Sequence, residues 1–224
     1  MIHEHHLPVT RTARYYTLGP ASGALTQLWI ACHGYGQLAA RFLHHFEAID
    51  DGTRLIVAPE ALARFYTTDN PGGTHAAAKI GASWMTREDR LSEIDDYIGY
   101  LDALYAQIAR EYDIDGARVV ALGFSQGVAT ICRWVERGRS RVDEVVLWAG
   151  SVPPDMDLAR PAHPLHTLRP IVVVGDTDEF APPAAVAAHE KLLREKHIEH
   201  EVIRFAGGHR LDYDTLSALA ARWG

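Results

Sequence analysis

The sequence predicts an α/β fold in which a mostly parallel sheet is covered by helices on both faces. Short apolar runs alternate along the chain with longer segments whose apolar residues recur every three or four positions. Most of these runs are near-continuous, as expected of strands buried on both faces. The 224 residues contain no internal repeat and no linker, so we expect a single domain over residues 1–224.

The composition excludes several functional classes. A net charge of −7 does not favour binding to nucleic acid or to an anionic membrane, and no apolar run could span a bilayer. Residues 1–6 lack the pattern of a secretory signal, and their histidines are expected to form a solvated tail rather than a metal site. Cys32 and Cys132 lie in apolar segments and are expected to be buried free thiols. We therefore expect a cytoplasmic protein without stable membrane association, metal or cofactor; a homodimer is compatible with the sequence.

Seven segments have the composition of strands. The first alternates over residues 9–18, which suits an edge strand with one wet face. The other six are apolar runs bounded by turn residues. These interior strands are expected over residues 25–32, 55–59, 119–122, 144–148, 170–175 and 201–205.

Amphipathic segments separate most of these strands. The longest follows Thr86, which is expected to be the N-cap, with Asp89 in the capping-box position. Pro182 and Pro183 open a later helix, because proline is favoured in the first helical turn. The helices are expected over residues 37–49, 86–112, 128–135 and 182–196, with a closing helix through Trp223.

Two long segments lack periodicity. Residues 60–85 hold an Asn-Pro-Gly-Gly sequence, and loops of this length in a compact domain are usually functional. Phe65, Tyr66 and Trp84 in this segment are expected to contact substrate. Residues 151–169 are interrupted by prolines, which prevent a long amphipathic helix, so we expect no large lid domain.

The pentapeptide Gly123-Phe124-Ser125-Gln126-Gly127 directly follows one apolar run and precedes a helical run. Strand, sharp turn and helix with a serine at the turn form the context of a nucleophile elbow. The turn forces the serine backbone into strained angles, and the flanking glycines lack the Cβ atoms that would collide with neighbouring backbone. We therefore expect Ser125 to be a nucleophile.

Such a serine needs a base, and position selects one of the thirteen histidines. The carboxyl ends of the strands form the site in a sheet of this kind, and only His33 and His209 directly follow interior strands. His209 comes after two glycines and last in the chain, which fits the order serine, acid, histidine. His209 is therefore the expected base, and His33 is expected to fix a loop.

A carboxylate must orient the base. Asp176 and Asp178 both follow the strand that ends at Gly175. Asp178 lies further out and can reach the His209 loop, whereas Asp176 is expected to bond local backbone in an Asx turn. Asp178 is the preferred acid and Asp176 the alternative.

An oxyanion formed at the substrate carbonyl needs two N–H donors. The residue after the nucleophile, Gln126, supplies one. The His33-Gly34-Tyr35-Gly36 loop follows an early strand and supplies the other, with Tyr35 as the preferred donor.

The Gly-Phe-Ser-Gln-Gly elbow, the His-Gly-x-Gly loop, the Gly-Asp-x-Asp sequence and the late Gly-His pair resemble the phospholipase/carboxylesterase family of α/β hydrolases. This group includes small carboxylesterases and acyl-protein thioesterases, and the resemblance extends from His33 to His209. It implies an α/β-hydrolase fold and hydrolysis of carboxylic ester or thioester bonds. The triad implied by the resemblance is Ser125, Asp178 and His209.

The chain departs from the family in two places. Gln37 stands where an acidic residue is frequent, and residues 83–88 replace a Trp-Phe-Asp type of segment. The leading hypothesis is a serine hydrolase that cleaves short- to medium-chain esters or thioesters through an acyl-enzyme. One alternative is hydrolysis of a small amide or peptide by the same triad. Another is a non-catalytic binding module on the hydrolase fold, which the intact triad argues against.

Overall fold

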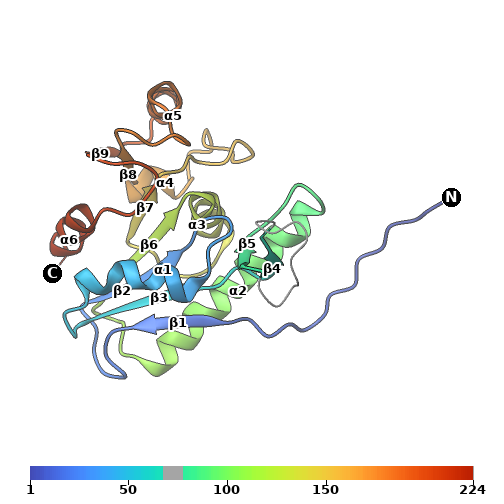
Figure 1. Cartoon of the computed structure of the whole chain (residues 1–224), viewed down its shortest axis with the longest axis horizontal. Coiled ribbons are helices and arrows are strands. Elements are labelled where there is room, and N and C mark those ends of the chain that lie inside the picture. The colour runs from blue at the N-terminus through green and yellow to red at the C-terminus, as the bar shows by residue number, and fades with distance from the viewer. Residues whose placement is uncertain (68–77, 224) are drawn as a thin grey trace.

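The computed structural model describes residues 1–67 and 78–223 and is built around a seven-stranded sheet (Figure 1). The strand order is β1-β3-β2-β6-β7-β8-β9, and only the edge strand β1 runs antiparallel to its neighbour. The mostly parallel sheet confirms the expected fold class. Its strands are β1 (Tyr15–Leu18), β2 (Gln27–Cys32), β3 (Arg54–Pro59), β6 (Arg118–Phe124), β7 (Glu144–Trp148), β8 (Ile171–Gly175) and β9 (Glu201–Phe205).

Helices cover both faces of the sheet, because successive strand residues point to opposite sides. On β6, Val119 and Ala121 belong to the apolar cluster that contains α2, α3, α4 and α5, whereas Val120 and Leu122 belong to the cluster with α1, η1 and α6. The helices are α1 (Ala39–Leu43), the 3₁₀-helix η1 (His44–Ile49), α2 (Arg90–Glu111), α3 (Gln126–Arg137), α4 (Leu165–Leu168), α5 (Pro183–Glu195) and α6 (Tyr213–Ala221).

The edge strand is shorter than the alternating pattern predicts. Pairing with β3 covers only Tyr15 to Leu18, opposite Pro59 to Ile56. The partner strand ends at Pro59, and beyond it the Glu60 N–H donates to Arg14 O at 3.0 Å. Residues 9–13 lie past the end of this ladder. Residues 1–14 form no helix or strand, and they extend away from the sheet in Figure 1.

Two helix predictions need correction at their ends. Thr86 is not an N-cap: its Oγ1 accepts a hydrogen bond from the N–H of Glu88, and α2 begins four residues later, at Arg90. The N-cap is Asp89, at a φ of 46°. The helix expected over residues 37–49 is α-helical only in α1 and tightens into η1.

The segment 60–85 is not wholly irregular. It contains β4 (Ala63–Tyr66) and β5 (Ile80–Ser83), which pair antiparallel. The part at 68–77, including its Asn-Pro-Gly-Gly sequence, lies outside the described residues. The strand β5 also bonds to the loop after β2, through Gly36 N–H to Ala82 O at 2.8 Å and Ala82 N–H to Gln37 O at 3.2 Å. The hairpin is therefore tied to the carboxyl edge of the sheet.

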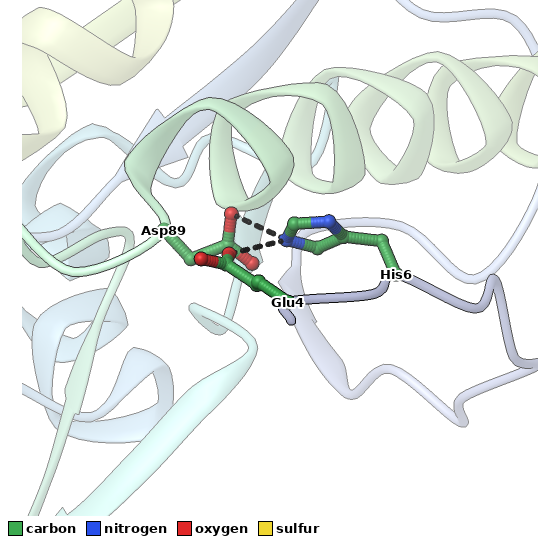
Figure 2. A group of neighbouring side chains, drawn as sticks. All are labelled: Glu4, His6 and Asp89. Atoms are coloured by element: carbon green, nitrogen blue, oxygen red, sulfur yellow. Dashed lines mark ion pairs between the residues drawn. The ribbon is translucent and has the colours of Figure 1, made fainter. Parts of the chain in front are cut away.

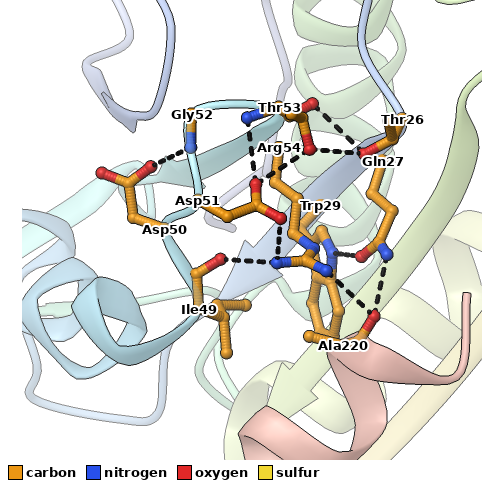
Figure 3. Close-up of polar contacts among 10 residues, drawn as sticks. All are labelled: Thr26, Gln27, Trp29, Ile49, Asp50, Asp51, Gly52, Thr53, Arg54 and Ala220. Atoms are coloured by element: carbon orange, nitrogen blue, oxygen red, sulfur yellow. Dashed lines mark hydrogen bonds and ion pairs between the residues drawn. The ribbon is translucent and has the colours of Figure 1, made fainter. Parts of the chain in front are cut away.

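At the opposite end of β2, a buried polar network holds the end of α6 (Figure 3). The Gln27 carboxamide is fully buried, donates to Ala220 O at 2.8 Å and accepts from the Trp29 indole at 2.8 Å. Arg54 donates to Ile49 O at 3.1 Å and to the same Ala220 carbonyl at 3.4 Å. These bonds satisfy a carbonyl that the helix end leaves without an intrahelical partner. They fix α6 on the sheet and with it the loop that precedes α6.

Cys32 on β2 and Cys132 on α3 are free and completely buried, as the sequence predicts. Burial raises the pKa of the Cys32 thiol and raises that of Cys132 to about 12. Desolvation of the thiolate is the main cause at both positions.

Candidate active site

Ser125 occupies the sharp turn between β6 and α3. Its φ of 53° and ψ of −116° lie outside the usual regions for a residue with a side chain. A Cβ on Gly123 would lie 2.3 Å from Gly127 O, and one on Gly127 would lie 2.1 Å from Cys32 O. Both positions therefore require glycine, as the elbow motif predicts. The strained turn costs about 1–3 kcal/mol and is sustained by this close packing.

The turn is anchored through its backbone and leaves the hydroxyl free. The Ser125 N–H donates to Trp148 O at 2.9 Å, and the Val128 N–H donates to Ser125 O at 3.0 Å. Within the part of the chain that the structure describes, the Ser125 hydroxyl has no hydrogen-bond partner. It is available to a substrate at the N-terminal end of α3, where the helix dipole favours negative charge.

His209 and Asp178 meet across the loops that follow β9 and β8. Nδ1 of His209 lies 2.9 Å from Oδ2 and 3.1 Å from Oδ1 of Asp178. A carboxylate only accepts, so Nδ1 carries the proton, and Nε2 of the neutral ring keeps its lone pair. The Asp178 side chain is fully buried, whereas the His209 side chain is 18% exposed. The unprotonated Nε2 therefore lies on the side of the ring away from the buried carboxylate.

After β8 the Asx turn forms at Asp178 rather than at Asp176. Asp178 forms the Asx turn, since its Oδ1 accepts from the N–H groups of Phe180 at 2.9 Å and Ala181 at 3.2 Å. Asp176 bonds across to the next loop instead, with Oδ1 accepting from Gly207 N–H at 2.9 Å. The expected Asx turn at Asp176 is therefore wrong. Asp178 fixes its own loop and also reaches His209.

Two aromatic rings hold the imidazole, and sequence reasoning assigned a role to neither. The His209 ring centroid lies 4.9 Å from that of Phe124 and 4.8 Å from that of Phe180. Phe124 directly precedes Ser125, so this contact places His209 beside the elbow. Phe180 is 72% exposed, and its contact with His209 becomes evident only in the folded structure.

The loop after β2 presents one unpaired N–H. Gly34 N–H donates to the Gln37 side chain at 2.7 Å, Gly36 N–H to Ala82 O, and Gln37 N–H to Gly34 O. Among the described residues the Tyr35 N–H has no acceptor. A Cβ on Gly34 would lie 3.2 Å from the Ser125 Cβ, so this loop passes close to the serine. The geometry suits the expected donor role of Tyr35, and Gln37 orients the preceding peptide.

Gln126 contributes in two ways. As the first residue of α3 its N–H has no intrahelical acceptor, which leaves it available to an oxyanion. Its side chain spans to the segment after β5: Oε1 accepts from Trp84 N–H at 3.1 Å, and Nε2 donates to Met85 O at 2.9 Å and to Ser83 Oγ at 3.1 Å. This side chain joins the elbow to the β4–β5 hairpin.

His33 supports the loop and has no nitrogen left for proton transfer. The ring is buried, with Nδ1–H donating to Gly34 O at 2.7 Å and Nε2 accepting from Ala61 N–H at 3.1 Å. Burial lowers the pKa of His33, which keeps the ring neutral. These bonds agree with the expected structural role.

The three expected substrate contacts have different surroundings. The Phe65 ring stacks on Tyr35, with centroids 5.2 Å apart, and so lies on the candidate oxyanion loop. Tyr66 is 51% exposed. Trp84 is buried, and its indole N–H donates to His33 O at 2.8 Å. Trp84 thus holds the start of the loop that follows β2. Contact of these three residues with substrate stays a prediction.

Of the N-terminal histidines, His6 lies against two carboxylates, those of Glu4 and Asp89 (Figure 2). Nε2 of His6 lies 3.2 Å from Glu4 Oε1 and 3.1 Å from Asp89 Oδ1, and all three residues are exposed. Exposed ion pairs of this kind contribute about 0–1 kcal/mol to stability.

No helix in the described ranges is both long and apolar enough to cross a membrane. The sequence predicts no lid in residues 151–169. The only helix of this segment is the four-residue α4. No large additional domain covers the carboxyl edge of the sheet in the described structure.

Comparison with solved structures shows the same fold in several hydrolases. Esterase PE8 is 21% identical, with a TM-score of 0.66 over 95% of this chain and 98% of that chain. Acyl-protein thioesterase 2 of Zea mays is 14% identical, with a TM-score of 0.68 over 95% and 100%. A carboxylesterase from Mesorhizobium loti is 20% identical, with a TM-score of 0.68 over 94% and 93%.

Comparison with curated proteins gives no match. The family model described as phospholipase/carboxylesterase matches residues 19–221, which includes every residue of the candidate site. The match spans most of the chain, and the neighbours include esterases and an acyl-protein thioesterase that share its fold. The chain therefore belongs to the phospholipase/carboxylesterase family of α/β hydrolases.

Proposed function

We propose that this chain hydrolyses carboxylic ester or thioester bonds through an acyl-enzyme on Ser125. The observation that supports this best is the bond of the His209 imidazole to the buried Asp178, beside a strained serine elbow. A free serine hydroxyl is a weak nucleophile until a base removes its proton, and Nε2 of His209 is free to accept it.

In the first half-reaction, Ser125 Oγ attacks the substrate carbonyl and its proton passes to His209 Nε2. The oxyanion accepts hydrogen bonds from the N–H groups of Tyr35 and Gln126. Loss of one such donor typically lowers turnover about 10²- to 10³-fold. The tetrahedral intermediate collapses, and His209 returns the proton to the leaving alkoxide or thiolate.

In the second half-reaction, water attacks the acyl-enzyme and gives its proton to His209 Nε2. Collapse breaks the bond to Ser125 Oγ, which takes the proton back, and the carboxylic acid leaves. Asp178 stays ionised throughout and stabilises the imidazolium. The single short helix in residues 151–169 supports soluble, short- to medium-chain acyl substrates, because no long apolar lid surface is present there.

The net charge of −7 and the two free cysteines support a cytoplasmic protein acting on small molecules. We also propose that residues 1–224 form a single domain.

The test combines a fluorophosphonate probe with a panel of p-nitrophenyl esters, acyl thioesters and aminoacyl amides. We expect the probe to label wild type and not Ser125→Ala, and we expect the variant to lose at least about 10³-fold in ester or thioester turnover with an unchanged melting temperature. Preferred cleavage of amides would replace the ester assignment. A wild-type protein that neither binds the probe nor turns over the panel would support a binding module.

A further inference from the structure

A second feature lies beside the candidate triad. A cavity of about 60 Å³ sits between the carboxyl ends of β7 and β8 and the first turns of α5. Its walls include Gly150, Ser151, Phe180, Val186 and His189. The volume is about that of two water molecules, so the cavity accommodates a group of two or three non-hydrogen atoms.

Two walls of the cavity touch the proposed catalytic residues. Gly150 packs on the backbone of the nucleophile, since a Cβ there would lie 2.7 Å from Ser125 O. Phe180 contacts the His209 ring at 4.8 Å between centroids. The candidate oxyanion loop instead follows β2, on the other side of β6. A group in this cavity is thus on the histidine side of the reacting carbon.

His189 gives the cavity one specific polar group. The residue is only 6% exposed, and its Nε2 accepts from Val152 N–H at 3.2 Å. Nε2 is therefore the unprotonated nitrogen, and Nδ1 carries the hydrogen. Burial, and to a lesser degree His200, lowers the pKa of His189 to about 4, so the ring is neutral near pH 7.

The Nδ1–H of His189 has no acceptor among residues 1–67 and 78–223. This nitrogen is not enclosed by protein. In the described structure, the side-chain atoms that are both fully buried and without a partner belong to Arg54, Glu60 and His163, and His189 is not among them. A donor that the protein leaves unpaired, in a nearly buried side chain on a cavity wall, is available to an acceptor that a ligand brings there.

We propose that this cavity is a leaving-group subsite that selects esters whose alcohol carries a second oxygen, and that His189 Nδ1–H donates to that oxygen. The inference rests on the proposed function, in which His209 returns its proton to the leaving oxygen. The leaving group must therefore lie on the His209 side, where Phe180 borders the cavity. Glycol and polyol monoesters are the substrate class with this chemistry.

The decisive experiment uses 2-methoxyethyl butyrate and butyl butyrate. Their alcohols have the same length and differ by one oxygen in place of one methylene group. Both form the same butyryl-enzyme, so a difference in kcat/KM arises before deacylation. Wild type should prefer the methoxyethyl ester about threefold to tenfold, the range of a net neutral hydrogen bond.

His189→Leu should lower that preference to about one, whereas His189→Gln, which keeps a donor and an acceptor, should retain part of it. His200→Gln is the matched control outside the cavity walls and should leave the preference unchanged. Equal kcat/KM values for the two esters in wild type, or an undiminished preference in a folded His189→Leu, would overturn the subsite while leaving the hydrolase intact.

A second measurement does not depend on catalysis. In the nitrogen-correlated NMR spectrum of Ser125→Ala, 2-methoxyethanol should shift the His189 ring resonances more than 1-butanol does. A selective shift in Ser125→Ala combined with absence of esterase and thioesterase activity in wild type would keep the subsite and reject the proposed function. Absence of a shift that is selective for 2-methoxyethanol would reject the subsite.

Discussion

Nε2 of Gln126 lies 2.9 Å from the carbonyl oxygen of Met85, so the first residue of α3 holds the segment that follows the β4–β5 hairpin. The same hairpin bonds to the loop that carries Tyr35. Both proposed oxyanion donors are thus joined through β5, and their separation depends on a side chain rather than on the sheet alone.

We expect Gln126→Leu to lower the free energy of unfolding by about 1–3 kcal/mol, because Trp84 N–H and Met85 O lose their partner. The substitution should lower kcat and change KM little. The N–H of residue 126 remains, but its position relative to Tyr35 is less well fixed. Gln126→Glu keeps the acceptor for Trp84 and should be affected less. Urea unfolding and ester kinetics measure the two effects. Wild-type values in the leucine variant would show that the hairpin is held by other contacts.

The aspartates after β8 should separate catalysis from stability. Asp178→Asn should lower kcat on the order of 10²- to 10⁴-fold, because the amide no longer stabilises the imidazolium. Asp176→Asn should mainly lower the melting temperature, because Asp176 accepts from Gly207 N–H across two loops. Melting curves and steady-state kinetics on both variants provide the check. The reverse pattern would move the acid role to Asp176.

Acid should destabilise the fold through His189. Its pKa is lowered to about 4 in the folded state, so between about pH 6.5 and 4 the unfolded chain binds a proton that the folded chain does not. The free energy of unfolding therefore decreases as pH falls through this window, by about 3 kcal/mol at pH 4 from this group. His200 and Glu190 are the charged neighbours that modulate it.

Urea unfolding of wild type and His189→Gln at several pH values isolates this contribution. The glutamine offers Val152 N–H an acceptor and does not titrate, so its stability should fall less steeply with acid. Parallel stability profiles for the two proteins would mean that His189 is not the responsible group.

Interfacial activation should be absent. The segment 151–169 holds only the four-residue α4, too short to present an apolar lid surface. With a short-chain triglyceride as substrate, the rate should saturate smoothly below the solubility limit. An abrupt rise in rate at that limit would indicate a covering element that opens at a lipid surface.

The elbow was predictable because local sequence determines it. A buried apolar run, two glycines that tolerate no Cβ and a helical run leave few conformations for Ser125. The expected placement of His209 and Asp178 at one edge of the sheet follows from the rule that the carboxyl ends of parallel strands share an edge.

The parts that the sequence did not predict depend on contacts between distant segments. The β4–β5 hairpin consists of two four-residue strands, too short for a periodic pattern to emerge. The Gln126 side chain, the ring of Phe180 and the Nδ1 donor of His189 acquire their roles only from residues distant in the sequence: Met85 for Gln126, His209 for Phe180 and Val152 for His189. The length of β1 is likewise set by the end of its partner at Pro59.

The buried thiols of Cys32 and Cys132 allow the opening rate of the core to be measured chemically. Alkylating reagents attack the thiolate, and neither sulfur meets solvent while β2 and α3 remain packed. Modification must then proceed through openings of the core itself. The rate of alkylation under native conditions thus measures how often the packing of β2 and α3 under the elbow opens, without any substrate.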